Sequence, residues 1–187
     1  MDDTELGDAV ARARDGDEAA FGVVYGELHP MLLGYLHGLI GDEADDIASE
    51  TWHDIVRDFG TFRGGGQAFR GWAATIARHR ALDHVRRRRV RPRTTELDVD
   101  VADHVAERTR AGGSEDAALE NISTARALSL IAELPRDQAE AVLLRVVLGL
   151  NGPMAAKVLG KRPGAVRTAS HRGLTRLSER LKGAEEK

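Results

Sequence analysis

The chain has 187 residues, of which 42% are hydrophobic and only 4% aromatic, with no cysteine and a formal net charge of -3. This length suits one large domain or two small ones, and the composition excludes collagen-like, low-complexity and disulfide-stapled proteins. A core built mostly from Leu, Val, Ile and Ala favours a helical protein over a β-sandwich, which needs more aromatic and Thr-rich alternation.

The absence of cysteine removes any thiol nucleophile and any Cys-ligated zinc or iron–sulfur site, and it fits a reducing, cytoplasmic location. The first residues are acidic, whereas a signal peptide begins with a positive segment. The apolar run over 139–150 contains Glu140 and Arg145, which interrupt it as a membrane span. We therefore expect a cytoplasmic protein that is neither exported nor inserted in a membrane.

Charge alternates along the chain. Residues 1–50 carry 13 acidic and 2 basic side chains, residues 51–95 carry 3 and 11, residues 96–120 carry 8 and 2, and residues 121–187 carry 6 and 12. Two basic surfaces separated by an acidic connector are the electrostatic footprint of a protein that binds a polyanion such as nucleic acid. The alternative explanation is that the charged residues only form solvent-exposed faces, and that their separation into acidic and basic blocks has no function.

The first expected elements are helices. From Asp17 apolar residues recur with helical spacing up to Pro30 and again beyond it, which predicts two short helices or one helix kinked at the proline. Gly41 and Asp42 then supply a stop and an N-cap for a third helix. Its apolar stripe consists of Ile47, Ala48, Thr51, Trp52, Ile55, Val56 and Phe59. Its other face carries Asp45, Asp46, Glu50 and Asp54.

Three adjacent glycines over 64–66 predict a loop, because glycine disfavours the helix. A fourth helix is expected from Ala68 into an arginine run, with its end before Pro92. Phe69 and Trp72 are expected in the core at helical spacing, whereas the loop from Phe62 to Gln67 is freer to meet a nucleic-acid base.

Residues 93–119 are acidic and poor in large apolar side chains, which predicts a flexible linker. Beyond it, apolar periodicity predicts a helix ending at Leu134, another over 139–147, and two more over 153–159 and 163–181. No strand signal of useful length occurs. The fold class is therefore predicted as all-α, with two small helical domains over 1–92 and 120–182 joined by this linker and followed by a tail over 183–187.

The strongest local motif lies over 152–172. A helix-turn-helix needs a small residue where its helices cross, a glycine at the turn and an aliphatic plug from the second helix, and Ala156, Gly160 and Val166 have that spacing. With Val166 inward, the second helix presents an outward face to DNA. That face carries Arg167, Thr168, His171 and Arg172. A plain helical hairpin explains neither this spacing nor the absence of acidic residues over 154–178.

Five segments occur in the order GDEAAFGVVYGEL, EADDIASETW, FRGGGQAFRGWAATIARHRALDHVRRRR, ALSLIAELPRDQAEAVLLRVVLGL and the helix-turn-helix. In this order the chain resembles a bacterial RNA polymerase sigma factor of the extracytoplasmic-function (ECF) group. The resemblance implies a promoter-specificity subunit of core RNA polymerase with no catalysis and no cofactor. The first domain would bind the β′ clamp and melt the minus-ten element, and the second would hold the β flap and read the minus-thirty-five element of promoter DNA. An anti-sigma factor is an expected further partner.

The resemblance also assigns residues. Those matching the clamp-binding motif are Asp45, Asp46, Ile47 and Glu50, and Trp72, Ile76, Ala77 and Arg78 match the melting helix. The residues expected at DNA are Phe62, Arg63, Arg78, His79, Asp83, Arg86, Arg87, Arg162, Arg167, Thr168, His171, Arg172 and Arg176.

The sequence departs from the family pattern at three of its positions. Ser49 replaces the usual Gln of the acidic motif, and His79 stands where the family usually has Asn. Arg162 occupies the place of a capping Ser or Asp, for which Pro163 at the first helical position partly compensates. The departure at Ser49 affects one polymerase contact, and the departure at His79 affects the preferred base of the minus-ten element. The departure at Arg162 affects the start of the second helix of the helix-turn-helix.

Two other classes of protein fit parts of the sequence. Glu50 and His53 have the Glu-x-x-His spacing of di-iron helical bundles, but that site needs a second such motif, which this chain lacks, so no metal is expected. A one-component regulator would explain the helix-turn-helix but not the arginine-rich helix of the first domain.

Overall fold

The computed structural model describes the backbone of residues 1–90 and 115–185 and the side chains of 1–88 and 124–182. No strand occurs in these ranges, which confirms the predicted all-α class. The N-terminal half contains α1 (Asp3–Arg14), α2 (Glu18–Ile40), the short 3-10 helices η1 (Gly41–Glu43) and η2 (Phe59–Thr61), α3 (Ala44–Asp58) and α4 (Gly66–Val90). The C-terminal half contains α6 (Glu115–Ala132), α7 (Arg136–Val142), the π-helix η3 (Leu143–Val147), α8 (Gly152–Leu159) and α9 (Pro163–Glu185).

Helix α1 is an element that the sequence analysis missed. Its start is a capping box, in which the Asp2 carboxylate accepts from the backbone N–H groups of Thr4 and Glu5 while the Glu5 carboxylate accepts from the Asp2 N–H at 3.0 Å. Leu6 and Val10, one turn apart, are buried against the rest of the N-terminal half. The Asp-x-x-Glu spacing followed by this apolar pair was the available signal.

Helix α2 is one continuous helix with Pro30 inside it, so the single-helix alternative holds. Asp17 caps its start by accepting from the Ala20 N–H at 2.9 Å, and Gly41 ends it with a φ of 70°. The expected N-cap role of Asp42 is wrong. The chain enters α3 through η1, and no side chain caps that helix, because the 3-10 turn already turns the backbone into it.

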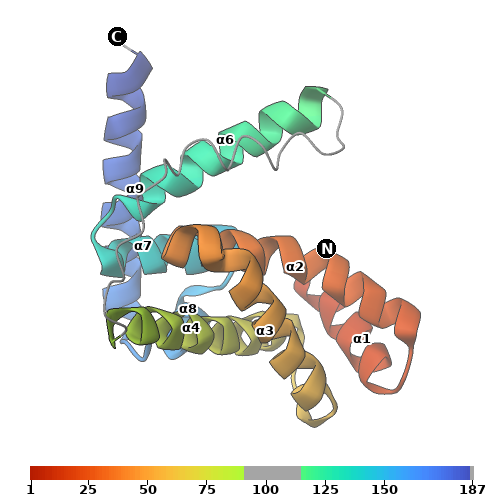
Figure 1. Cartoon of the computed structure of the whole chain (residues 1–187). Coiled ribbons are helices and arrows are strands. Elements are labelled where there is room, and N and C mark those ends of the chain that lie inside the picture. The colour runs from red at the N-terminus through yellow and green to blue at the C-terminus, as the bar shows by residue number, and fades with distance from the viewer. Residues whose placement is uncertain (91–114, 186–187) are drawn as a thin grey trace.

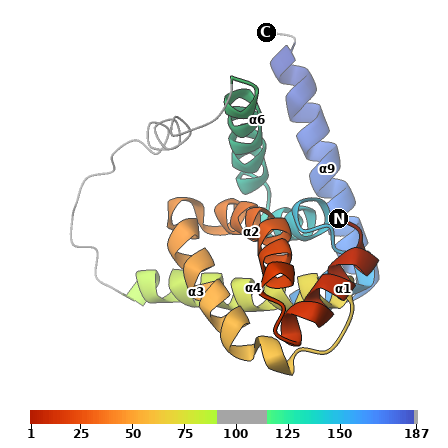
Figure 2. The same ribbon diagram turned by 90° about the vertical axis from the view of Figure 1, so that its right-hand side faces the viewer.

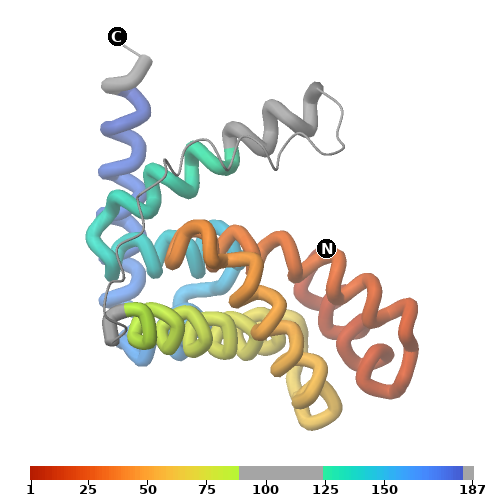
Figure 3. The backbone as a smooth tube through the Cα atoms, viewed as in Figure 1, coloured from red at the N-terminus to blue at the C-terminus, as the bar shows by residue number. Residues whose placement is uncertain are grey.

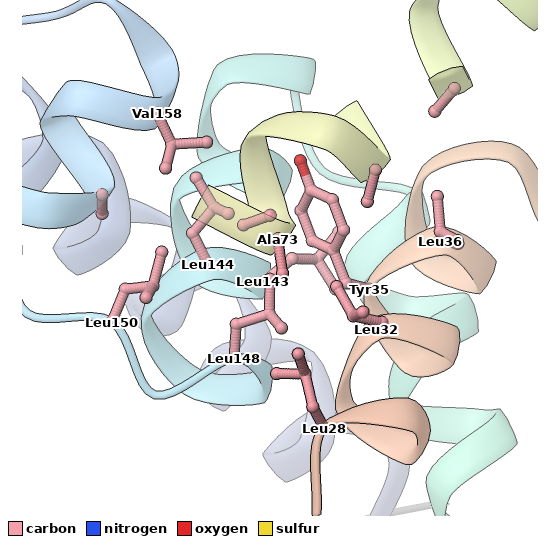
Figure 4. Packing of buried hydrophobic residues seen from close by; sticks show 14 of the residues in the cluster. Leu28, Leu32, Tyr35, Leu36, Ala73, Leu143, Leu144, Leu148, Leu150 and Val158 are labelled. Atoms are coloured by element: carbon pink, nitrogen blue, oxygen red, sulfur yellow. The ribbon is translucent and has the colours of Figure 1, made fainter. Parts of the chain in front are cut away.

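The two halves of the chain pack against each other around one continuous hydrophobic cluster. Helix α4 lies against α8, and α2 lies against α6, α7 and η3 (Figures 1 and 2). In Figure 4 the buried Tyr35 of α2 points between Ala73 of α4 and the leucines of η3. The N-terminus lies at the α1 side of this body, and α9 carries the chain away from it on the opposite side (Figure 3).

The predicted linker over 93–119 is only partly covered. Helix α6 begins at Glu115, inside the range predicted as linker, and residues 91–114 lie outside the described residues. The expected boundary after residue 92 falls in that undescribed range. Helix α9 continues to Glu185 and so includes part of the predicted tail.

Candidate polymerase and nucleic-acid interfaces

The acidic face of α3 has three exposed carboxylates near the start of the helix, on Asp45, Asp46 and Glu50. Helix α3 has this face because its opposite stripe is apolar and packs against α2 and α4. Asp45 lies 4.0 Å from His37 Nε2, and Glu50 lies 3.4 Å from Arg80 Nη1. These carboxylates form a negative patch that suits a basic partner.

Two expectations on α3 need correction. Ile47 is buried, so it holds the helix in the core and cannot itself touch a partner without rearrangement. Asp54 was expected on the exposed face but is only 6% exposed, because Arg57 and Arg80 enclose its carboxylate. The exposed acidic patch is therefore shorter than the sequence indicated.

The loop before α4 also differs from the expectation. Phe62, expected to meet a base, is 8% exposed and packs with its ring centroid 5.1 Å from those of both Phe69 and Trp72. An aromatic ring gains more from this cluster than from water, so the loop closes over α4 with the ring inward. Its neighbour Arg63 is exposed, and its guanidinium donates to the carbonyls of Gly60 and Phe62.

The second half of α4 presents an exposed polar face. His79, Asp83, Arg86 and Arg87 follow helical spacing, so they share this face, and all four are exposed. Asp83 pairs with Arg86 at 3.3 Å. Arg78 differs from these residues, because it is half-buried and its guanidinium lies 3.1 Å from the carboxylate of Glu140 in α7.

The predicted helix-turn-helix is formed by α8 and α9. Asn151 caps α8 by accepting from the Met154 N–H at 2.9 Å, a role that the sequence analysis missed. Gly160 ends α8 in the left-handed conformation with a φ of 63°, which the turn requires and glycine adopts without strain. Ala156 and Val166 are buried at the crossing of the two helices. The turn fixes α9 across α8.

The outward face of α9 is basic. Its inner face packs Val166, Ser170 and Gly173 against the rest of the C-terminal half, and a Cβ on Gly173 would lie 2.7 Å from Val142 Cγ2. The exposed residues at its start and on its outer face are Arg162, Arg167, Thr168, His171 and Arg172. Thr168 donates its hydroxyl to the Gly164 carbonyl at 3.0 Å, which leaves the oxygen able to accept.

Arg176 lies further along α9 and is exposed, but its guanidinium is tethered to α7. Its guanidinium donates to Gln138 Oε1 of α7 at 3.1 Å, and Gln138 is buried. By contrast, no carboxylate described in the structure forms an ion pair with Arg162, Arg167 or Arg172. The first turns of α9 therefore carry uncompensated positive charge, which favours an anionic partner.

Within residues 1–90 and 115–185 no group of three or more acidic or histidine side chains is arranged to hold a metal ion. Within the same ranges no helix has the length and apolar character to cross a bilayer.

Comparison with known proteins identifies the family. The model of sigma-70 region 2 matches residues 24–91, and that of sigma-70 region 4 matches residues 124–177. The chain is 34% identical over 182 residues to the ECF RNA polymerase sigma factor BldN of Streptomyces coelicolor, covering 96% of this chain and 67% of that protein. It is also 34% identical to the ECF sigma factor ShbA of Streptomyces griseus, covering 93% and 94% of the two chains. The chain belongs to the ECF RNA polymerase sigma factors.

Two solved sigma-factor structures share the fold. CnrH, in complex with the cytosolic domain of CnrY, superposes with a TM-score of 0.60 at 21% identity and covers 96% of this chain and 98% of its own. RpoE of Bartonella quintana, in complex with the anti-sigma factor NepR, gives a TM-score of 0.61 at 20% identity, with coverages of 87% and 96%. The family models and the curated relatives confirm the resemblance found in the sequence, and the chain functions as an alternative sigma factor in transcription initiation. The one-component regulator is not favoured.

Proposed function

We propose that this ECF sigma factor uses three separate faces to direct core RNA polymerase to its promoters. The acidic patch of α3 docks on the β′ clamp, the polar face of α4 binds the melted minus-ten element, and α9 enters the major groove of the minus-thirty-five element. The C-terminal half also holds the β flap. The observation that carries this proposal is the separation of charge by face, with exposed carboxylates on α3 and uncompensated arginines at the start of α9.

The residues divide by the kind of contact they make. Asp46 and Glu50 carry the charge that meets the clamp, while Ile47 positions them from the core. Arg86 and Arg87 neutralise phosphates near the minus-ten element, and the ring of His79 contacts a base there. Arg167 and Arg172 of α9 reach base edges, whereas Arg162, just before α9, and Arg176 contact the phosphate backbone.

The functional units are residues 1–92 and 120–182, which enclose the two matched family regions. The chain acts without catalytic chemistry of its own, in the cytoplasm where RNA polymerase works. An anti-sigma factor is its expected inhibitor, because the similar CnrH and RpoE chains were each solved with a bound protein partner, which for RpoE is the anti-sigma factor NepR.

Transcription in a purified system tests this function. Core RNA polymerase is mixed with the full chain and sheared genomic DNA from the source organism, and the 5′ ends of the transcripts are sequenced. We expect discrete start sites that share two upstream elements and that require both the chain and the core enzyme. Binding of duplex DNA by the chain alone, with no association with core polymerase, would instead favour the one-component regulator.

A further inference from the structure

Helix α1 lies outside the matched family regions, yet it contacts the loop that precedes α4. The match to sigma-70 region 2 begins at residue 24, whereas α1 ends at Arg14. The helix packs against both α2 and α4, beside the start of α4 (Figure 2). The family match therefore assigns no role to α1, and its role has to be inferred from the contacts that it makes.

Two glycines bring the backbones of α1 and the loop together. A Cβ on Gly66 would lie 2.3 Å from the Asp3 carbonyl oxygen, so no larger residue fits there without a shift of the backbone. A Cβ on Gly7 would lie 3.2 Å from the backbone nitrogen of Gly66, a tight contact that the loop can relieve by a small movement. Glycine destabilises a helix relative to alanine, and in α1 the close approach of the loop offsets this cost.

Polar side chains hold α1 in this position. The Asp3 carboxylate accepts from Gln67 Nε2 at 3.2 Å and lies 3.6 Å from Arg70 Nη1, and both partners belong to the first turns of α4. Arg70 is only 7% exposed, and its Nη2 lies 3.4 Å from the carboxylate of Glu27 in α2. A guanidinium is planar and rigid, so its pairing with carboxylates of two helices holds those helices in one arrangement. Helix α1 is therefore fixed relative to the start of α4.

The loop is held at its other end by the buried ring of Phe62, which leaves a short exposed stretch between the two anchors. Arg63, Gly64 and Gly65 form this stretch, and Gly64 has a φ of 147° that favours glycine. A Cβ on Gly65 would meet no atom within 4 Å. An open hollow of about 620 Å³ lies beside Gly65, with α1 as one of its walls. Residues 63–65 are thus the part of the loop that a nucleic-acid strand can reach.

We propose that α1 positions this loop for the choice of base in the minus-ten element, with Gly7 and Asp3 as the positioning residues. Through them α1 sets where residues 63–65 meet the melted strand. This inference rests on the proposed binding of that strand by α4 and the residues next to it. Discrimination between bases depends on the geometry of the contact, because hydrogen bonds weaken steeply as their angle and distance change. A small shift of the loop therefore alters discrimination while the charges that hold the strand stay in place.

The substitution Gly7→Ala tests this role in the full chain bound to core polymerase. Alanine favours the helix, so α1 stays folded, but the added Cβ presses on Gly66 and shifts the loop. We expect discrimination at one minus-ten position to fall about fivefold, the lower end of what one base contact supplies. Competition among forked promoter DNAs that differ at single positions measures it. The matched Gly22→Ala lies in open space on α2 and should leave discrimination unchanged.

Two further substitutions show whether α1 acts through the loop. Gly65→Ala adds a Cβ in open space, so it should leave the fold intact and change discrimination at the same minus-ten position as Gly7→Ala. The double variant should show less than the product of the two single effects, because residues that act on one contact are not additive. Asp3→Ala removes the acceptor of Gln67 and should affect that position too, whereas Asp3→Asn keeps an accepting oxygen and should restore most of the discrimination.

Three results would count against the two proposals in different ways. If Gly7→Ala is folded by circular dichroism and leaves discrimination unchanged, or weakens binding to all the DNAs evenly, α1 does not position the loop. If Gly65→Ala has no effect on DNA binding, the loop does not meet the strand and the inference is overturned as well. If the holoenzyme with the unmodified chain shows no base preference at any minus-ten position, the proposed function fails. That last result comes from the unmodified chain alone, so it is distinguishable from the other two.

Discussion

Arg80 of α4 and Asp54 of α3 form a close ion pair, with Nε 2.6 Å and Nη2 2.5 Å from the same carboxylate oxygen. The other oxygen accepts from Arg57 at 2.7 Å. Because Asp54 is buried, this pair joins the helix proposed to bind polymerase to the helix proposed to bind DNA. It therefore fixes the relative position of the two faces.

Replacing Asp54 should destabilise the protein. Asp54→Ala leaves Arg80 partly buried without its main partner, and we expect a loss of about 2 kcal/mol in the free energy of unfolding, because part of Arg80 can reach water. Thermal unfolding followed by circular dichroism measures this change. Asp46→Ala, at an exposed position on the same helix, should change stability by less than about 0.5 kcal/mol. Equal effects of the two substitutions would contradict the structural role of Asp54.

Charge reversal on the acidic patch should weaken assembly with core polymerase. The double variant Asp46→Lys/Glu50→Lys places like charges against a basic partner, and we expect the dissociation constant for core enzyme to rise at least about tenfold. Binding of labelled sigma factor to core enzyme gives this value. The matched variant Asp8→Lys/Asp15→Lys changes charge equally at exposed positions in and next to α1 and should leave it unchanged. Unaltered affinity of the α3 variant would exclude this docking face.

His79→Asn should change base preference more than affinity. The ring is exposed on α4 beside Asp83 and Arg86, where a base of the melted strand would pass. Loss of a base contact alters discrimination at one position, while loss of a phosphate contact weakens all sequences alike. Competition among forked promoter DNAs that differ at single minus-ten positions measures both effects. A uniform loss of affinity would make His79 a phosphate contact.

Arg167 and Arg176 should respond differently to alanine substitution. Arg167 is exposed one turn into α9, so Arg167→Ala should relax specificity at one base pair by about 1–3 kcal/mol. Arg176 already donates to Gln138, so Arg176→Ala should lower thermal stability as well as weakening all promoters evenly. Holoenzyme binding to promoters with single changes in the minus-thirty-five element separates the two patterns. If neither substitution alters this binding, α9 does not contact DNA.

The cap of α2 should contribute to acid sensitivity. The pKa of the Asp17 carboxyl lies below its ordinary value of 3.8. The main cause is the hydrogen bond from the Ala20 N–H, and the second is the hydrogen bond from the Arg12 guanidinium. A carboxyl with a lower pKa in the folded state stabilises the protein above its unfolded pKa, and this stabilisation is lost as the pH falls through the folded value. Asp17→Asn keeps an accepting oxygen but cannot titrate, so its stability should depend less on pH below about 4. Urea unfolding at several acidic pH values checks this, and equal slopes for both proteins would contradict it.

The helices and the helix-turn-helix were predictable because their signals are local. The spacing of apolar residues predicted α3 and α4, Gly160 predicted the turn, and Val166 predicted the inner face of α9. Each of these signals lies in residues only a few positions apart. The missed α1 had a local signal too, in its capping box. The basic outer face of α9 follows from the same periodicity, since fixing the inner residues fixes the outer ones.

Only the tertiary structure decided which particular side chains are buried and which partners they contact. Phe62 turned inward because Phe69 and Trp72 offered an aromatic cluster, and Asp54 became buried because Arg80 came from another helix. Arg78 meets Glu140 across 62 residues of sequence. The sequence determined which faces are apolar, basic or acidic. The packing of α2 and α4 against α7, η3 and α8 decided which of those charges face solvent, because burial depends on which surfaces meet in space.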